Sequence, residues 1–230
     1  MSFIPDKNLF LVTSAIKSLN TKFWSHEQRF QQTVLTVESI RKQVPEAIIV
    51  IADASLTPLT EDEHKQLQPY VNVFMDMNQI PEVNRFSSSG HQALAESFLL
   101  LNALYALKQQ PWIKEVKRIF KISGRSILEP GFNLSEYDDL FGKYVFKKRI
   151  STWMSQVTHG ATDLLITRMF SLCPSLIDNY MEITQKNLPL FQFMDFEHAH
   201  FVNIPKEHLV EFYKIHCSGW LAGNGQVENY

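Results

Sequence analysis

The sequence is poor in cysteine and glycine, and each shortage excludes some classes of protein. Its 230 residues contain two cysteines, Cys173 and Cys217, and eight glycines. Two cysteines cannot form a disulfide framework, and their surroundings show no spacing typical of a metal site. The sequence also has no Gly-rich dinucleotide fingerprint, no Walker-type phosphate loop and no nucleophile elbow. Several common enzyme families are therefore excluded.

Strong charge of one sign and long apolar runs are missing as well. The formal net charge is −2, which argues against broad attraction to nucleic acid or to an acidic membrane surface. We therefore expect no nucleic-acid partner, and any anion-binding site must be local. No apolar run reaches the length of a membrane span, and residues 1–8 do not resemble a signal peptide. Together with the low cysteine content, these features predict a cytoplasmic protein.

What the sequence does contain is a regular alternation of apolar runs and capped helices. The runs at 9–16 and 47–52 are nearly continuous, which is typical of strands covered on both faces. Ser25 and Gln28 form a capping-box pattern, which predicts that a helix begins directly after Ser25. The elements expected in this half lie, in order, at 9–16, 25–44, 47–52, 60–67, 71–75, 92–108 and 119–122. This alternation predicts an α/β fold with a mostly parallel twisted sheet flanked by helices.

The pattern is less regular after Pro130. We expect a strand over 164–170, a helix over 175–184, a short acidic helix that begins near Asp195, and a further helix over 205–213. The serine-containing polar stretch 79–90 is expected to be a flexible connection. The length allows one substantial core, so we predict a single domain over residues 1–230.

The segment 118–126 is the strongest candidate for a ligand site. It reads Arg-Ile-Phe-Lys-Ile-Ser-Gly-Arg-Ser, a short apolar strand that runs into a turn. Ligands of open α/β sheets bind outside the carboxyl ends of the strands. Gly124, next to Ser123, lets backbone N–H groups approach a ligand, and the cations of Lys121 and Arg125 match phosphate. We predict a site for an anionic, diphosphate-bearing ligand. The alternative is a structural turn whose cations pair with nearby carboxylates.

Two other strand ends carry acidic residues. Asp53 follows the second buried strand, where a carboxylate either accepts hydrogen bonds from a nucleoside or shapes a turn. Asp76 and Asn78 follow the third strand. Their side-chain oxygens could hold a divalent cation, since hard cations prefer oxygen ligands. A structural role is the alternative for each of these residues.

The segment around Glu197 is dense in titratable groups. Asp195, Glu197, His198 and His200 lie among aromatic residues. A partly buried carboxylate there could act as a general base, and a histidine could bind phosphate or metal. The alternative is that one histidine is a satisfied core residue and the other groups are solvated. Arg168 lies in an apolar stretch, where it needs either an acidic partner or a ligand.

Two further charged features need an explanation. Glu96 lies on an otherwise apolar helix and requires a partner, for which Lys121 and Arg125 are the candidates. The basic cluster 147–149 is expected to be a solvated loop.

Several short motifs, taken together, resemble small glycosyltransferases with the GT-A fold, in particular glycosyltransferase-like proteins of bacteria and large viruses. These motifs are Leu-Val-Thr-Ser at 11–14, Gln-Arg at 28–29, Gln-Thr at 32–33, Ser-Ile-Arg at 39–41, Ile-Val-Ile-Ala-Asp at 49–53, Phe-Lys-Ile-Ser-Gly-Arg at 120–125, Thr-Arg at 167–168 and Glu-His at 197–198. They are distributed over most of the chain.

The resemblance implies a nucleotide-sugar donor that lies over the carboxyl ends of the first strands. Residues 1–126 would then form the nucleotide-binding half and residues 127–230 the acceptor and catalytic half. Thr13, Ser14 and Asp53 would face the nucleoside, and the end of the fourth strand would face the diphosphate. An acidic residue that opens a late helix commonly acts as the base in inverting enzymes of this type. Glu197 matches that position, with Asp195 as second choice.

One departure from the family pattern concerns the metal. Such enzymes usually carry Asp-x-Asp after the fourth strand, where this sequence has Ser123-Gly124-Arg125. Within this resemblance, the departure puts a need for metal in doubt and suggests that cations of the protein replace the metal at the leaving diphosphate. We expect that no cofactor is required, although Mn or Mg stays open. Asp76 and Asn78 follow the third strand instead, so a structural role is favoured for them.

These inferences predict a transferase that moves a sugar from a nucleotide-diphosphate-sugar donor to a glycan or related acceptor. Lys121 and Arg125 would stabilise the leaving group, and Glu197 would deprotonate the acceptor, with Arg168 and His198 as further substrate contacts.

One alternative is a non-catalytic module that binds a nucleotide or sugar. Another is a nucleotidyltransferase, which would need a Gly-rich loop with Arg or Lys after the first strand. Residues 15–20 contain one Lys and no Gly, which disfavours it.

Overall fold

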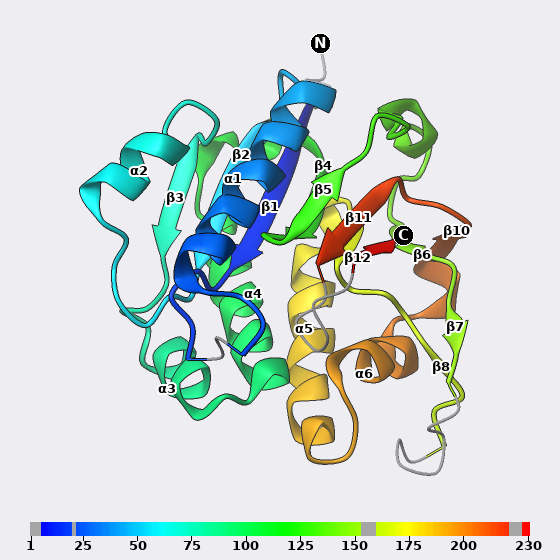
Figure 1. Cartoon of the computed structure of the whole chain (residues 1–230). Coiled ribbons are helices and arrows are strands. Elements are labelled where there is room, and N and C mark those ends of the chain that lie inside the picture. Colours follow the sequence, from blue (N-terminus) through cyan, green and yellow to red (C-terminus); the bar gives the residue numbers. More distant parts are fainter. Residues whose placement is uncertain (1–5, 20–21, 153–159, 221–226) are drawn as a thin grey trace.

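A seven-stranded mixed sheet forms the centre of the protein (Figure 1). The structure is a computed structural model that describes residues 6–19, 22–152, 160–220 and 227–230. The strand order is β10-β6-β9-β4-β1-β2-β3. The bounds are β1 (Lys7–Ser14), β2 (Ile48–Asp53), β3 (Val73–Asp76), β4 (Val116–Ser123), β6 (Tyr144–Lys147), β9 (Met169–Leu172) and β10 (Leu209–Phe212). The predicted α/β class with a mostly parallel sheet is confirmed.

The parallel register brings four strand ends to one edge of the sheet. In β1, Thr13 pairs with Ser123 of β4 and Ser14 pairs with Asp53 of β2. Asp53 pairs in turn with Asp76 of β3. The polar residues that end these four strands therefore lie side by side, as the apolar runs of the sequence predict.

The segment before β9 reaches the same edge from the other direction. β9 runs antiparallel to β4 and to β6, and β10 pairs parallel with β6. Because β9 runs antiparallel to β4, the residues that precede it lie beside the carboxyl end of β4. The backbone N–H of Ser123 donates to the carbonyl of Arg168 at 2.8 Å. Residues from both halves of the chain thus meet at one place.

Helices cover both faces of the sheet, because consecutive residues of the central strands are apolar and point to opposite faces. Leu9 and Leu11 of β1 point to the face covered by α4 (Gln92–Lys108) and α5 (Ile177–Asn187). Phe10 and Val12 point to the opposite face, which is covered by α1 (His26–Gln43). Figure 1 shows α1 on one side of the sheet with α4 behind it. The remaining helices are α2 (Glu61–Leu67), α3 (Pro81–Ser89) and α6 (Phe196–Asn203).

Two small sheets complete the described structure. One has the order β12-β11-β5, formed by β5 (Ser126–Leu128), β11 (Cys217–Trp220) and β12 (Val227–Asn229). The other pairs β7 (Ile150–Ser151) with β8 (Asp163–Leu164). Among the described residues, no helix has the length and apolarity needed to cross a membrane.

Three expected elements were wrong. The polar stretch 79–90 contains α3, with Pro81 as its first residue and Gly90 as its C-cap. Gly90 has a φ of 74°. A proline at the start and a left-handed glycine at the end are ordinary start and stop signals of a helix. Residues 205–213 form one 3₁₀ turn followed by β10, because pairing with β6 overrides the helical start at the proline. The strand expected over 164–170 is interrupted between β8 and β9, where the chain changes partners.

Candidate active site

A pocket of about 390 Å³ lies at the carboxyl ends of β1 and β4. Its walls come from the loop after β1, from α1, α3 and α4, and from the turn after β4. The residues that line it are Thr13, Ser14, Ala15, Ile16, Ser18, Leu19, Arg29, Thr33, Ala54, Leu56, Phe86, Ser87, Gly90, Gln92, Ala95, Glu96, Leu99, Ser123, Gly124 and Arg125. Five of the predicted substrate-binding residues, those in β1 and in the turn after β4, are therefore in this wall.

Gly124 lets the turn after β4 pack against the end of β1. Its backbone N–H donates to the carbonyl of Thr13 at 2.8 Å, and its carbonyl accepts from the hydroxyl of Thr33 at 3.0 Å. A Cβ at this position would lie 3.0 Å from Ser14 Cβ and 3.3 Å from the Thr13 carbonyl oxygen. A side chain at this position would therefore require its neighbours to move by a few tenths of an ångström. The close approach places Arg125 in the pocket wall.

Arg125 is a half-buried cation that forms no ion pair with a described residue. Its buried Nη1 has no hydrogen-bond partner among the described residues. Burial, followed by the charges of Arg29 and Arg168, lowers the pKa of its guanidinium to about 10. Arg125 remains protonated at neutral pH in a place where positive charge is already concentrated. Such a group favours an anionic ligand.

Arg29 and Arg168 contribute to this concentration from other elements. Arg29 lies on the buried face of α1, lines the pocket and donates from Nη1 to the carbonyl of Ala15 at 3.3 Å. Arg168 precedes β9, and its guanidinium lies 5.9 Å from the centre of the Tyr230 ring. It also donates to the carbonyl of Trp220 at 3.4 Å. Arg168 does not line the pocket, so its effect on a ligand there would be electrostatic.

Lys121 does not reach the pocket. Its side chain is 2% exposed, and its Nζ donates to Oε1 of Glu96 at 2.5 Å and to the carbonyl of Thr167 at 2.8 Å. Of the two partners proposed for Glu96 from the sequence, the structure shows Lys121. The direct role of Lys121 at a diphosphate remains a prediction, and the geometry favours a role through Glu96.

Glu197 is connected to the same polar network. The hydroxyl of Thr167 donates to its Oε1 at 2.9 Å. Burial raises the pKa of Glu197, and the carboxylates of Glu96 and Asp195 raise it further. An elevated pKa is suited to a group that takes up a proton. Glu197 is not among the described residues that line the pocket.

Asp195 and His198 form a pair at the start of α6. Asp195 is the N-cap and accepts from the backbone N–H of His198 at 2.9 Å. Its Oδ1 also lies 2.6 Å from Nδ1 of His198. Because a carboxylate only accepts, Nδ1 donates to Asp195, and Nε2 is the other ring nitrogen. That Nε2 is buried without a partner among the described residues, and His198 is not in the pocket wall.

Asp53 supports the pocket from behind. It is buried and accepts three hydrogen bonds, from the hydroxyl of Ser14 at 2.6 Å and from the backbone N–H groups of Ile16 and Ser55 at 3.2 and 3.1 Å. These bonds fix the loops after β1 and β2. Asp53 is absent from the pocket-lining set, so contact with a nucleoside stays a prediction for this residue.

The turn after β4 does not offer the carboxylate oxygens that a divalent cation prefers. The turn after β4 offers a hydroxyl, a glycine and a guanidinium, and the last of these repels a cation. Asp76 accepts from the backbone N–H of Asn78, whose own Oδ1 accepts from Gln79 at 2.6 Å. Over residues 6–19, 22–152, 160–220 and 227–230, no group of three His, Cys, Asp or Glu side chains could hold a metal.

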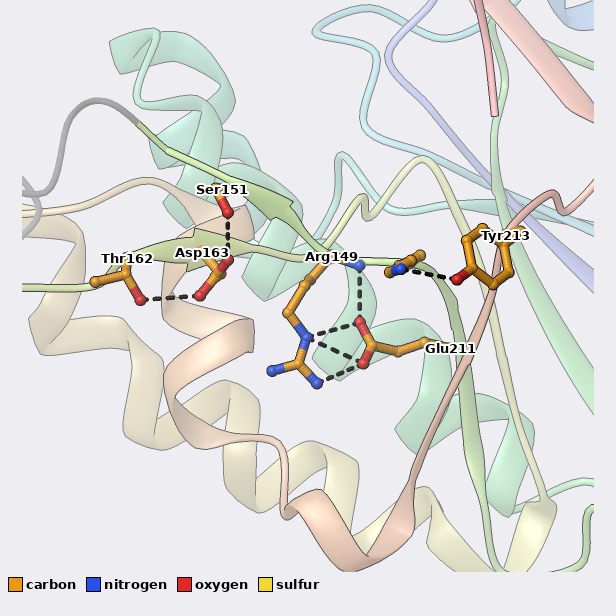
Figure 2. A network of polar contacts seen from close by, with 7 residues as sticks. Arg149, Ser151, Thr162, Asp163, Glu211 and Tyr213 are labelled. Carbon is orange, nitrogen blue, oxygen red and sulfur yellow. Dashed lines mark hydrogen bonds and ion pairs between the residues drawn. The ribbon is translucent and has the colours of Figure 1, made fainter.

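The basic cluster 147–149 is engaged within the protein rather than free. Lys147 donates to the carbonyl of Asn229 at 3.1 Å, and Lys148 donates to the hydroxyl of Tyr213 at 3.0 Å. Figure 2 shows Arg149 bound through several contacts to Glu211. The cluster therefore ties β6 to β10 and the carboxyl-terminal strand.

Two charged residues of the pocket wall, Arg29 and Glu96, were not predicted as site residues. A signal for Arg29 is present in the sequence, because it shares the inward stripe of its helix with Thr33, Val37 and Ile40. A signal for Glu96 is also present, since it is the one acidic residue of α4. Neither signal shows whether the side chain reaches the pocket, because that depends on how the helices pack against the sheet.

Comparisons with known proteins give a fold and no family. No protein-family model matches the sequence, and no curated protein sequence matches it. Mouse xyloside xylosyltransferase 1 in its apo form matches with a TM-score of 0.54 at 13% identity, over 90% of this chain and 85% of that chain. The galactosyltransferase LgtC, in complex with donor and acceptor sugar analogs, matches with a TM-score of 0.53 at 8% identity, over 89% and 72%.

A third similar structure is core-mannan synthase A from Aspergillus fumigatus in its Mn/GDP form. It has a TM-score of 0.51 at 9% identity, over 89% of this chain and 72% of that chain. At these identities the similarity shows the fold alone, which is that of GT-A glycosyltransferases. The neighbours include proteins of a mouse and of a fungus, so the narrower resemblance to bacterial and viral proteins stays a prediction.

Proposed function

We propose that this chain is a glycosyltransferase that moves a sugar from a nucleotide-diphosphate-sugar donor to a glycan or related acceptor. The observation that carries the proposal is Arg125. In a GT-A fold, it presents a buried guanidinium atom without a partner among the described residues, at a pocket on the carboxyl ends of β1 and β4. Ligands of such sheets bind at this edge. The pocket also contains hydroxyl groups that can bind a polar ligand.

In the proposed reaction, the bond between the sugar carbon and the diphosphate oxygen breaks, and the electron pair stays on that oxygen. The acceptor oxygen forms the new bond to the sugar carbon. Negative charge therefore develops on the leaving diphosphate, and Arg125, with Arg29 beside it, would stabilise this charge. In this proposal the arginines take the role that a metal would have, because the turn after β4 offers no carboxylate.

We propose Glu197 as the base that accepts the proton of the acceptor hydroxyl. Its raised pKa favours proton uptake, and its hydrogen bond from Thr167 fixes its orientation. Asp195 is less suited, because Oδ1 is already engaged by the backbone and ring of His198. His198 would then support the start of α6, with its substrate contact as a further prediction.

A non-catalytic module that binds nucleotide sugars is the second candidate. One observation favours it, since neither Asp195 nor Glu197 lines the pocket. Against it stands Glu96, an acidic side chain within the pocket wall. Release of nucleoside diphosphate from a nucleotide sugar, measured with and without an acceptor, separates the two candidates. The compartment that we propose is the cytoplasm, in keeping with two free, buried cysteines.

The proposal is tested by binding of nucleotides to the Arg125→Ala variant. Calorimetry with UDP and GDP, and with uridine and guanosine, is carried out with and without manganese. Removing Arg125 is expected to weaken binding of the diphosphate by about 1.5–3 kcal/mol and to leave the nucleoside nearly unchanged. Lys186→Ala, at an exposed cation of α5, is the control. Equal losses for diphosphate and nucleoside would show that Arg125 is structural.

A further inference from the structure

The pocket carries charges of both signs. Arg125 contributes the positive side, and Glu96 of α4 contributes a carboxylate to the same wall. The two charges influence each other, since Glu96 raises the pKa of Arg125 against the stronger lowering effects of burial and the other arginines. A ligand that fits both must have an anionic part and, beside it, a part that donates hydrogen bonds.

Glu96 is held in one orientation by a buried lysine. Its side chain is 34% exposed, whereas that of Lys121 is 2% exposed. Lys121 binds Oε1 of Glu96 and the carbonyl of Thr167, so it joins α4 to the segment before β9. No bond from a described residue to Oε2 of Glu96 is present. One oxygen is therefore fixed, and the other is free to accept from a ligand.

Stability alone gives little reason for this ion pair. The rest of α4 is strongly apolar, with Leu99, Leu100, Ala103, Leu104 and Leu107 buried in the core. Replacing a buried ion pair by apolar residues is often neutral or stabilising. Glu96 is a carboxylate on such a helix, and Lys121 of the central strand β4 pairs with it. This arrangement is better explained by the pocket that Glu96 lines.

The charge state of Glu96 follows from its neighbours. Burial acts to raise its pKa, but the cations of Lys121 and Arg168 act in the opposite direction, and the net pKa lies below the ordinary value. Glu96 is ionised at neutral pH and can only accept hydrogen bonds.

We propose that Glu96 binds hydroxyl groups of the sugar that is transferred, and that Lys121 is the residue that positions it. This inference rests on the proposed function, because it places the diphosphate at Arg125 and the sugar next to it. The free Oε2 accepts from a sugar hydroxyl while Oε1 stays on Lys121. Glu96 then distinguishes a nucleotide sugar from the free nucleoside diphosphate, which lacks the donors that Glu96 recognises.

The test compares two pairs of ligands on the full chain by calorimetry: UDP-glucose against UDP, and GDP-mannose against GDP. Glu96→Gln keeps the size of the side chain and removes its charge. The variant is expected to raise the Kd of the nucleotide sugar about 10-fold or more, since hydrogen bonds to charged groups are strong. The Kd of the matching diphosphate should change less than about threefold.

Two further variants keep the test decisive. Glu182→Gln removes one partner of an exposed Glu–Lys pair on α5 and should change neither Kd. Glu96→Gln combined with Lys121→Met removes both charges, so it avoids an unpaired buried lysine if the single variant fails to fold. The double variant should show the same selective loss for the nucleotide sugar.

The possible outcomes separate this inference from the proposed function. If Glu96→Gln and the double variant change the two ligands of a pair equally, or change neither, Glu96 does not bind the sugar, and the anion site at Arg125 is untouched. If the wild-type chain binds none of the four ligands, the proposed function and this inference are both overturned.

Discussion

Glu197 and Asp195 are two residues apart, yet their surroundings differ. Glu197 is largely enclosed and accepts from the Thr167 hydroxyl, whereas Asp195 is exposed and caps α6. A group that takes a proton in the reaction needs an adjusted pKa and a free lone pair. Glu197 meets the first condition through burial and neighbouring carboxylates, and its Oε2 has no hydrogen bond from a described residue.

We therefore expect Glu197→Gln to reduce sugar transfer by roughly 10²–10⁴-fold, the usual contribution of a general base. Binding of the donor should stay within a few-fold of the wild type. Transfer is measured as nucleoside diphosphate released in the presence of an acceptor, and Asp195→Asn, which keeps the cap, is the matched control. Near-normal transfer by Glu197→Gln together with loss in Asp195→Asn would move the assignment to Asp195. If neither variant loses activity, the inverting mechanism is wrong.

His200 gives the second prediction at the scale of one residue. It is fully buried, with Nδ1 2.7 Å from the Phe196 carbonyl and Nε2 2.9 Å from the Tyr180 hydroxyl. The carbonyl only accepts, so Nδ1 carries the proton and Nε2 accepts from Tyr180. Burial lowers the pKa of His200 to about 4, so the folded state holds the neutral ring.

The pH dependence of stability follows from this lowered pKa. Between about pH 6.5 and pH 4, the unfolded chain binds a proton at this histidine that the folded chain does not bind. The contribution of the neutral His200 to the free energy of unfolding is therefore complete above about pH 6.5 and is lost as the pH falls toward 4. We expect a loss on the order of 3 kcal/mol from His200 over this window. The raised pKa of Glu197 acts in the opposite sense.

Urea unfolding of the wild type and of His200→Gln, at several values between pH 4 and 7, checks this prediction. The variant should lose part of the slope of stability against pH. His91→Gln, at an exposed histidine, should keep the full slope. An unchanged slope in His200→Gln would contradict the role given to His200.

At the scale of elements, α1 does more than cover the sheet. Its hydroxyl groups bind the backbone that follows β4: Thr33 donates to the Gly124 carbonyl, and Thr36 and Ser39 accept from the N–H groups of Ser126 and Leu128. The helix thus holds the turn that carries Arg125. Such side-chain contacts to backbone are long-range in sequence and fix one structure.

We expect Thr36→Val to lower the free energy of unfolding by about 1–3 kcal/mol, because the buried N–H of Ser126 loses its acceptor. Thr184→Val is the matched control. Thr184 is equally buried, but its hydroxyl donates to the Tyr180 carbonyl of its own helix, so its replacement leaves no backbone N–H of another element without an acceptor and should cost less. Chemical denaturation of both variants measures the difference. Equal losses would mean that the bond between α1 and β5 contributes nothing of its own.

At the scale of the whole molecule, the central sheet joins the two halves of the chain. β4 pairs with β1 on one side and with β9 on the other. The core on the α4 side likewise combines residues of β1 with Phe170, Tyr180 and Ile183. Neither the sheet nor this core is complete in residues 1–126 alone.

We therefore predict that the full chain unfolds in one cooperative transition and that a fragment of residues 1–126 does not fold by itself. In the fragment, β4 would become an exposed apolar edge, which favours aggregation. Near-ultraviolet circular dichroism and urea titration of both proteins test the prediction. A cooperative transition of the fragment would show instead that the nucleotide-binding half is an independent domain.

The sequence by itself determined the elements whose signals are local. The apolar runs of β1, β2 and β4 and the capping box at Ser25 predict much of the first half of the fold. The position of the turn at 123–125 also followed, because parallel strands end at one edge. Capping, helical periodicity and continuous apolar runs depend on residues near one another in the chain, so one sequence is enough to read them.

Only the tertiary structure decided which side chains face the pocket. In the folded chain, Lys121 pairs with Glu96 and does not line the pocket. Asp53 binds Ser14 and also lies outside the pocket wall, whereas Arg29 is part of that wall. The tertiary structure also made β10 a strand, through pairing with β6. The physical reason is the same in each case. Burial and long-range hydrogen bonds give a buried charge or a short segment its partner, and those partners lie far away in the sequence.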